Sequence, residues 1–308
     1  MSGLTSLMIS FYELNRSSTF CCSETTLRQR YKHEFQQLLH HRLNQSYEQP
    51  SNVSYSMASS LPKLPYFYSL WKTSRLLPRL ITPCEHQVYI KLLKTLHDLC
   101  ESNGIHYMIS HGTLLGSYRN HDILPYDDDA DVLIPRKDYS RLAELNQLNN
   151  ETDWEFYLKS SRNMKFYFRK SPPAGRYSWK WPFIGIQFYT ETATHIKIKR
   201  DISKQFIFPL VLRPIATLWL RAPRNAHKYL NSLMNGHYSK FSIDEKCLLQ
   251  KYSHRHEAHR YISRAVDCVQ LHNTYPFIRR TCDETYCQEH FMLNNQTVLY
   301  TLKMLKDQ

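Results

Sequence analysis

The stretch from residue 105 to residue 134 limits the possible folds of this chain more than any other. It reads IHYMISHGTLLGSYRNHDILPYDDDADVLI. Ile105–Ile109 and Val132–Ile134 are apolar runs that predict buried strands. Between them, small residues at 110–113 break the first strand and Leu114–Arg119 predicts a short helix. A strand, a tight turn, a short helix and an acid-rich strand can together hold a metal-bound phosphate.

The acidic residues stand at alternate positions before the second predicted strand. Asp127, Asp129 and Asp131 are two residues apart, a spacing that puts their side chains on one face of a strand and those of Asp128 and Ala130 on the other. Carboxylates that crowd together repel one another, and a hard divalent cation such as Mg²⁺ (or Mn²⁺) relieves the repulsion. We therefore predict a metal site at these three residues. A solvated acidic turn is the alternative.

Gly112 and Thr113 lie in the turn before the predicted helix. Backbone N–H groups at a helix start favour an anion. We therefore predict that Gly112 and Thr113 bind a phosphate group.

Length and composition favour one folded domain with a tail. The 308 residues are 42% hydrophobic and carry a net charge of +13, which favours anionic partners such as nucleotides and phosphorylated glycans. Lys and Arg are scattered, so nucleic acid is not favoured. Residues 1–80 lack periodicity and are expected to be low in order, apart from a modest helix around 24–43. Residues 81–308 form the predicted domain, which starts with a capping box at Thr82 and Glu85. The helix that follows is expected to carry an apolar stripe, with Cys100 in the core, at Val88, Leu92, Leu96, Leu99 and Cys100.

The remaining patterns predict an α+β fold with a mixed sheet flanked by helices. The expected elements are a helix over Lys137–Leu148 and strands over Trp154–Leu158, Phe166–Arg169, Trp181–Tyr189 and Ile196–Ile198, with the last two paired. The sequence contains no stretch of 18 or more apolar residues, the length that would predict a membrane span. Phe206–Leu220 is apolar but interrupted by prolines, so it is expected in the core.

Cysteines and histidines allow more than one interpretation. The eight cysteines suit disulfides in a secretory lumen or buried cytosolic thiols. Cys282, Cys287 and His290 could bind zinc, although a disulfide or free thiols are favoured. The histidines of SHRHEAHRY, at 254, 256 and 259, are expected on a surface helix rather than around a metal. N-x-S/T sequons favour the secretory pathway and occur at Asn15, Asn44, Asn52, Asn150 and Asn295.

The segment HGTLLGSYRNHDILPYDDDADVLI resembles the LicD family. This family comprises nucleotidyltransferase-fold enzymes, including bacterial phosphocholine transferases, fukutin and fukutin-related proteins. Weaker similarity runs from Thr82 to the C-terminus and is greatest to invertebrate LicD-like proteins.

The resemblance implies a metal-dependent phosphotransferase in protein glycosylation. Such an enzyme would move a phosphocholine or ribitol-phosphate type group from a CDP-activated donor to a hydroxyl of a glycan or glycoconjugate. Asp129 and Asp131 would be catalytic, and Arg119 would add positive charge near the phosphate. The resemblance also implies the Golgi or endoplasmic reticulum lumen, with any membrane association arising from a segment outside this sequence.

One position departs from the family pattern. The third carboxylate, expected on a neighbouring strand, falls at Gly185, and this acid would be a candidate general base. Either Glu191 or Gln187 substitutes for it, or the protein is a degraded enzyme that binds nucleotide or glycan without turnover. A GT-A glycosyltransferase with a D-x-D metal strand is a further alternative, which the GTLLG turn disfavours.

A second basic segment also allows two interpretations. Pro209–Tyr229 carries Arg213, Arg221, Arg224 and Lys228 among apolar residues. These cations could clamp a diphosphate, but ordinary solvated charge is the favoured interpretation of each.

Overall fold

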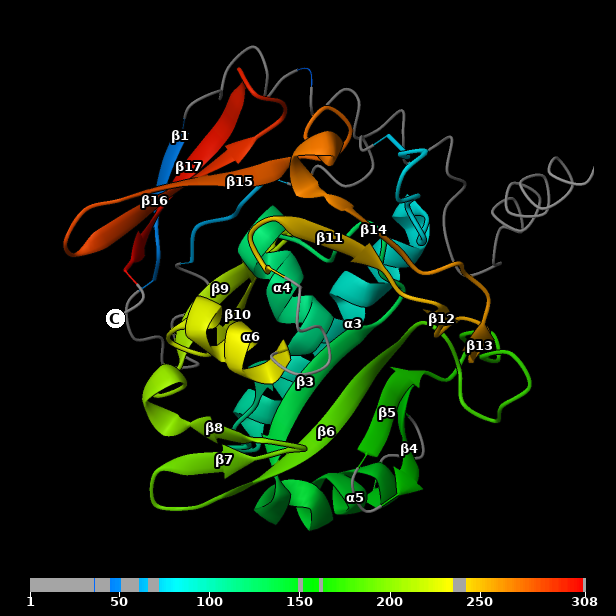
Figure 1. Ribbon diagram of the computed structural model, residues 1–308. Coiled ribbons are helices and arrows are strands. Elements are labelled where there is room, and N and C mark those ends of the chain that lie inside the picture. The colour runs from blue at the N-terminus through cyan, green and yellow to red at the C-terminus, as the bar shows by residue number, and fades with distance from the viewer. Residues whose placement is uncertain are drawn as a thin grey trace, which may run out of the picture.

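A computed structural model describes residues 36, 45–50, 61–65, 72–148, 152–160, 163–234 and 242–306. Its main sheet has the strand order β2-β3-β6-β5-β4, and β7 and β8 extend it beside the end of β6 (Figure 1). The strands are β2 (Met108–Ile109), β3 (Ala130–Pro135), β4 (Trp154–Ser160), β5 (Asn163–Phe168), β6 (Phe183–Glu191), β7 (His195–Lys197) and β8 (Asp201–Ser203). Only the β3–β6 pair is parallel among these pairings. The mixed sheet confirms the predicted α+β class, and β7 pairs with β6 as expected.

Within the described residues, four helices flank this sheet. They are α3 (Pro83–Ser102), α4 (His111–Asn120), α5 (Tyr139–Leu148) and α6 (Ala226–Met234). In Figure 1, α4 and α6 lie on one side of the sheet and α3 on the other. The layers bury one continuous core that runs from α3 through β3 and β6 to the aromatic side chains of β4 and β5. This packing fixes the position of the loops before and after α4.

The start of α3 follows the predicted capping box. Thr82 Oγ1 accepts a hydrogen bond from the Glu85 amide at 3.2 Å, and Glu85 Oε2 accepts one from the Thr82 amide at 2.8 Å. The predicted apolar stripe is buried, including Leu92, Leu96 and Cys100. Cys100 is a free thiol in the core, as expected.

The boundaries around the central stretch differ from those predicted. The first strand is only Met108–Ile109, and the helix is longer, His111–Asn120. The second strand begins at Ala130. Asp127 and Asp129 therefore precede β3, and strand alternation cannot be the reason for their positions. Asp128, which lies between them, is held instead by hydrogen bonds from residues 253–255.

A second sheet packs beside the first and has the order β1-β17-β16-β15 (Figure 1). Its strands are β1 (Gln45–Glu48), β15 (Phe277–Cys282), β16 (Tyr286–Met292) and β17 (Val298–Leu305). Strand β1 runs parallel to β17, and Leu64 and Leu77 are buried. These parts of residues 1–80 therefore pack against the rest of the folded protein. The helix expected around 24–43 lies outside the described residues apart from Gln36, and the division at residue 80 stays a prediction.

Short two-stranded sheets lie between β8 and β15 along the chain. They consist of β9 (Val211–Ile215) with β10 (Leu218–Ala222), β11 (Lys246–Leu249) with β14 (Arg264–Asp267), and β12 (Tyr252–Ser253) with β13 (Ala258–His259). The apolar stretch 206–220 thus contributes to a hairpin, and Ile215 and Leu220 are buried in it. None of the helices in the described ranges is long and apolar enough to cross a membrane.

A buried ion cluster joins the second sheet to the rest of the protein. Glu289 of β16 accepts hydrogen bonds from Arg213 at 2.9 Å and from Arg280 at 2.8 Å, and its other oxygen lies 2.6 Å from His121 Nε2. These cations lower the pKa of Glu289 well below its ordinary value despite its burial. Arg213 is therefore neither a diphosphate clamp nor a solvated charge. The neighbouring Arg221 is likewise paired, with Glu101 at 2.8 Å.

Two disulfides stabilise the C-terminal half. Cys247 is bonded to Cys268, and Cys282 is bonded to Cys287 across the β15–β16 hairpin. The zinc alternative for Cys282 and Cys287 is therefore wrong, and the favoured disulfide is confirmed. The sequon at Asn295 lies in the exposed β16–β17 turn, whereas the other four sequons lie outside the described residues.

Candidate active site

The start of α4 touches the acidic loop at Gly112. A Cβ atom at this position would lie 2.3 Å from Asp127 Oδ2, a separation that real side chains do not tolerate. Gly112 therefore lets the first turn of the helix meet the carboxylate. The GT turn and the acidic block, predicted to form one site, are brought together by this contact.

Thr113 fixes the start of β3 against the same helix. Its Oγ1 accepts a hydrogen bond from the Asp131 amide at 2.7 Å, and the Ser110 amide donates to the Asp131 carbonyl at 3.1 Å. The Thr113 hydroxyl is thus engaged in a hydrogen bond within the protein. Its backbone N–H, in the first turn of α4, is among the groups that have no partner within a helix.

The predicted metal ligands form an electrostatically crowded group. Burial raises the pKa of Asp127 well above its ordinary value, and the charges of Asp129, Asp128 and Asp131 raise it further. The carboxyl groups of Asp127 and Asp129 are within hydrogen-bond contact. Burial and Asp129 raise the pKa of Asp131 in the same way. Across the described ranges, however, no three His, Cys, Asp or Glu side chains are arranged as a complete metal centre.

Asp128 points away from the other acids and anchors a distant loop. Its carboxylate accepts hydrogen bonds from Ser253 Oγ at 2.8 Å and from the amides of His254 and Arg255 at 3.0 and 3.1 Å. Its carbonyl accepts from Tyr89 and Trp181 at 2.6 and 2.8 Å. Asp128 is separated from its acidic neighbours as predicted. The cause is this hydrogen-bond network and not strand alternation.

The anchored loop brings a histidine to the site that the sequence did not assign to it. His254 Nε2 lies 3.2 Å from Asp129 Oδ2. The surface helix expected over 254–259 is wrong, because this segment is a tight turn between β12 and β13. The partner aspartate is more than 120 residues away, so no local pattern could have revealed the contact.

Gly185, which occupies the position expected for the third carboxylate, lies beside the acidic strand. Gly185 of β6 is paired in register with Asp131 of β3, and a Cβ at Gly185 would lie 2.5 Å from Asp131 Oδ1. Lys165 of β5 is the next residue in this row. Its Nζ donates to the buried Glu257 at 2.8 Å. A lysine–glutamate pair therefore lies beside Asp131.

The two suggested substitutes for that acid have different positions. Glu191 is exposed at the end of β6, where it pairs with Lys204 at 2.6 Å. Gln187 is paired with Leu133, two positions along β6 from Gly185. Glu191 is therefore engaged elsewhere, and Gln187 is the nearer of the two to Gly185 on the same strand face.

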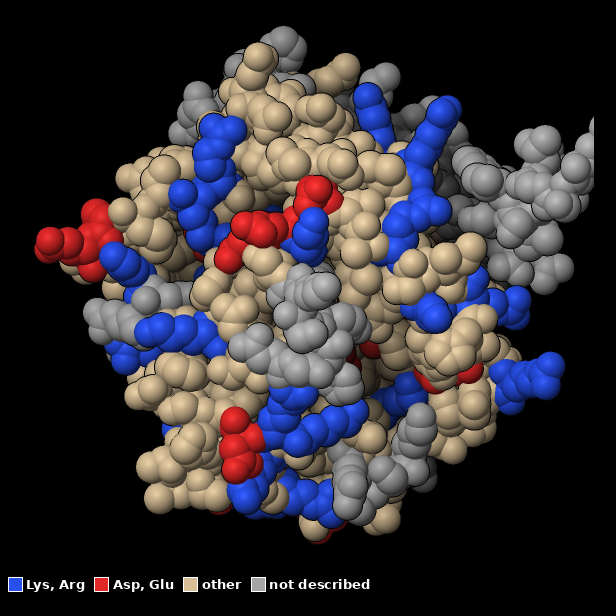
Figure 2. All heavy atoms as spheres, viewed as in Figure 1, with Lys and Arg blue, Asp and Glu red and all other residues tan. Residues whose placement is uncertain are grey.

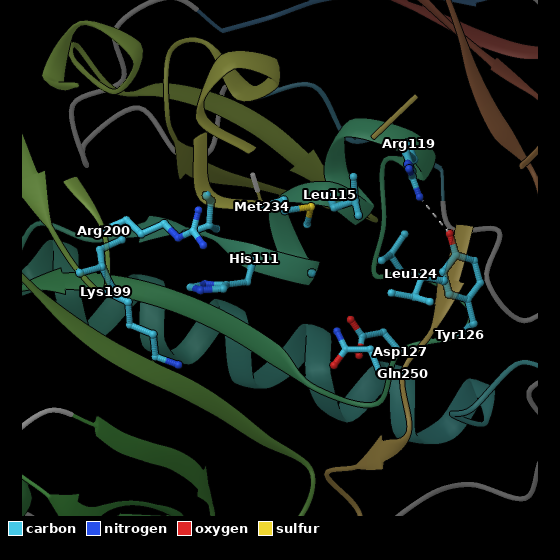
Figure 3. A pocket seen from close by; sticks show the side chains of 14 residues that line it. His111, Leu115, Arg119, Leu124, Tyr126, Asp127, Lys199, Arg200, Met234 and Gln250 are labelled. Carbon is cyan, nitrogen blue, oxygen red and sulfur yellow. Dashed lines mark hydrogen bonds between the residues drawn. The ribbon is translucent and has the colours of Figure 1, made fainter. Parts of the chain in front are cut away.

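Arg119 lines the site, but its guanidinium is occupied by protein groups. Its Nε donates to the Ile243 carbonyl at 2.7 Å, and its Nη2 donates to the Lys246 carbonyl at 2.8 Å. A weaker contact reaches Tyr126 at 3.4 Å (Figure 3). Arg119 thus fastens α4 to the segment before β11, a role that its spacing from the GT turn did not indicate.

A cavity of about 340 Å³ opens beside the GT turn. Asp127 and Gln250 lie at one end in Figure 3, and His111, Lys199 and Arg200 lie toward the other. Leu115, Leu124, Leu233, Met234 and Leu248 contribute apolar walls. The cavity is therefore acidic at one end and basic at the other.

His111, the first residue of α4, lies toward the basic end. Its φ of 47° is in the left-handed region, where a residue other than glycine costs about 1–3 kcal/mol and where functional sites concentrate. Burial lowers its pKa to about 4, and nearby Lys199 lowers it as well. The imidazole is neutral at pH 7, and its buried Nδ1 makes no hydrogen bond to any described residue.

The start of a helix and an acid-rich strand thus meet at one cavity, an arrangement suited to a metal-bound phosphate. A family model described as the LicD/FKTN/FKRP nucleotidyltransferase domain matches residues 104–225. This match supports membership of the LicD family for residues 104–225.

Individual relatives agree with this assignment. Lipopolysaccharide cholinephosphotransferase LicD of Haemophilus influenzae is 38% identical over 58 residues, which is 19% of this chain and 22% of the relative. Ribitol 5-phosphate transferase FKRP of Homo sapiens is 27% identical over 157 residues, 48% of this chain and 31% of the relative. An uncharacterized protein of Rickettsia prowazekii is 42% identical over 55 residues, covering 18% and 21% of the two chains. The matches thus span less than a third of each relative.

Proposed function

We propose that this protein transfers a phospho-alcohol group from a CDP-activated donor to a hydroxyl of a glycan. The observation that carries the proposal is the contact between the first turn of α4 and Asp127, which only a glycine at position 112 allows. It lies within the residues matched by the LicD family model. The names of two relatives, a cholinephosphotransferase and a ribitol 5-phosphate transferase, supply the reaction class.

The acidic group fits a divalent cation that a diphosphate helps to bind. Asp127 and Asp129 are in contact, and Asp131 follows at the start of β3. Mg²⁺ is usually bound by one or two carboxylates, with substrate phosphates completing its shell. The absence of a complete three-residue centre is therefore compatible with such a site. We propose that Asp127 and Asp129 hold the ion with help from Asp131.

The bound ion would offset negative charge on the diphosphate and on the departing CMP. The protein's own groups would orient the donor. Backbone N–H groups of Gly112 and Thr113, at the positive end of α4, suit phosphate oxygens. The apolar walls of the cavity would exclude water from the uncharged part of the ligand.

Deprotonation of the acceptor hydroxyl is the step for which this chain lacks the carboxylate expected from the family. Gly185 replaces the third acid, and Lys165 with Glu257 lies beside Asp131 instead. This substitution favours a second candidate function, binding of nucleotide or glycan without turnover. A general base contributes about 10²- to 10⁴-fold to rate, so its loss alone would leave slow transfer.

We also propose a location in the secretory pathway, in the Golgi or endoplasmic reticulum lumen. The disulfides Cys247–Cys268 and Cys282–Cys287 support it, because such bonds persist in oxidising compartments. Partners there would be the nucleotide-linked donor and a glycan or glycoconjugate acceptor.

Release of CMP from CDP-choline and CDP-ribitol, with Mg²⁺ and a glycan mixture, tests the transferase against the binder. We expect metal-dependent CMP release that disappears in Asp131→Asn. A transferase slowed by loss of the third acid should be about 10²- to 10⁴-fold slower than a relative that retains it. CDP binding without any CMP release would instead establish the non-catalytic function. Absence of both would contradict the proposal.

A further inference from the structure

The proposed metal and phosphate site does not use the basic end of the cavity. Lys199 and Arg200 line it from the turn between β7 and β8. Arg200 extends toward His111 in Figure 3. In the space-filling view, Lys and Arg side chains gather over the area where β7 and β8 lie (Figure 2). This end is separate from Asp127, so it cannot simply neutralise the acidic loop.

Lys199 and Arg200 differ from the other cations near the site. Arg119 donates to backbone carbonyls, Lys165 is paired with Glu257, and Arg255 is paired with Glu85 at 2.7 Å. Neither Lys199 nor Arg200 makes an ion pair with any residue that the structure describes. Unpaired cations that face a cavity are suited to an anionic ligand group.

The neutral His111 adds to this suitability. It stands at the first position of α4, beside both cations, without competing for an anion as an acid would. The helix start contributes partial positive charge at the same place. A hydrogen bond from His111 or its backbone could therefore supplement two charge-assisted contacts.

We infer that Lys199 and Arg200 form an anion-binding subsite for a phosphoryl group of the substrate, in place of the predicted Arg119. This inference rests on the proposed function, since it assigns the basic end of the same cavity. The phosphoryl group belongs either to the CDP donor or to a phosphorylated acceptor. The donor and the acceptor would present the same phosphoryl chemistry, and titrations with CDP and with inorganic phosphate distinguish the two sources.

The test is isothermal titration of the full chain with CDP, with cytidine, and with inorganic phosphate in the presence of saturating CDP and Mg²⁺. The variant is Lys199→Ser/Arg200→Ser. The matched control is Lys170→Ser/Lys197→Ser, which removes the same net charge at exposed positions outside the cavity. Each lost charge-assisted contact should weaken binding by about 10-fold, and the control should bind like the wild type.

Two outcomes support the subsite and two overturn it. If the variant loses CDP affinity but retains cytidine binding, the subsite serves the donor. If CDP binding is unchanged but phosphate binding is lost, it serves the acceptor. Unchanged binding of both, or equal losses in the control, overturns the inference. A wild type that binds no CDP contradicts the proposed function, and phosphate titrated without CDP then decides the subsite alone.

Discussion

Gly112→Ala should lower the rate of transfer about 100-fold while the protein remains folded. The new methyl group would lie 2.3 Å from Asp127 Oδ2, so the carboxylate must leave its position beside the helix start. Displacement of a catalytic group by about 1 Å can lower the rate about 100-fold. Alanine would by itself favour the helix by about 1 kcal/mol relative to glycine, which opposes the cost of the clash. The measurements are kcat/KM for CMP release and the thermal unfolding midpoint.

Ser117→Ala is the matched control for this change. Ser117 is buried on the same helix, and its Oγ has no hydrogen-bond partner within the described ranges. Its replacement adds no atom and should leave both measurements near the wild-type values. If Gly112→Ala raises the unfolding midpoint and keeps full activity, the close contact with Asp127 has no functional importance.

Glu289→Gln should produce the largest loss of stability. Glu289 is 2% exposed and contacts Arg213, Arg280 and His121. Removal of its charge leaves two arginines without their buried counter-ion, at a cost of about 3–5 kcal/mol. Denaturant unfolding at pH 7 measures this cost. Glu284→Gln, at an exposed position in the adjacent turn, should change stability by less than about 0.5 kcal/mol.

The same residue predicts a pH dependence. The arginines lower the folded-state pKa of Glu289 well below its ordinary value, so the unfolded chain binds its proton more readily. The stabilisation is complete above the unfolded pKa of about 4.3 and is lost as pH falls through the folded-state value. The difference in unfolding free energy between wild type and Glu289→Gln should therefore shrink in acid. A difference that stays constant down to pH 2 would contradict the ion cluster.

Local patterns predicted the elements better than the contacts between them. The capping box at Thr82, the apolar stripe of α3 and the pairing of β6 with β7 depend on neighbouring residues, and all were predictable. The gathering of Asp127 and Asp129 was also predicted, although for the wrong reason. Their positions depend on hydrogen bonds from residues 253–255 to Asp128, which no local periodicity encodes.

The same limit applies to the charged side chains of the site. Arg119 stands at the expected spacing from the GT turn, yet its guanidinium is taken up by carbonyls at 243 and 246. His254 reaches Asp129 from a segment with a helical-looking histidine spacing. Lys199 and Arg200 lie in an unremarkable basic turn. Each of these roles depends on packing between distant segments, which only the structure reveals.

The central claim is that the acidic loop and the start of α4 form a metal-dependent nucleotide site. Isothermal titration of CDP, with and without Mg²⁺, on the wild type and on Asp129→Asn tests it most directly. We expect CDP binding that requires Mg²⁺ and is lost in the variant, while both proteins unfold at similar temperatures. Equal CDP binding with and without metal, or none in a folded wild type, would contradict the claim.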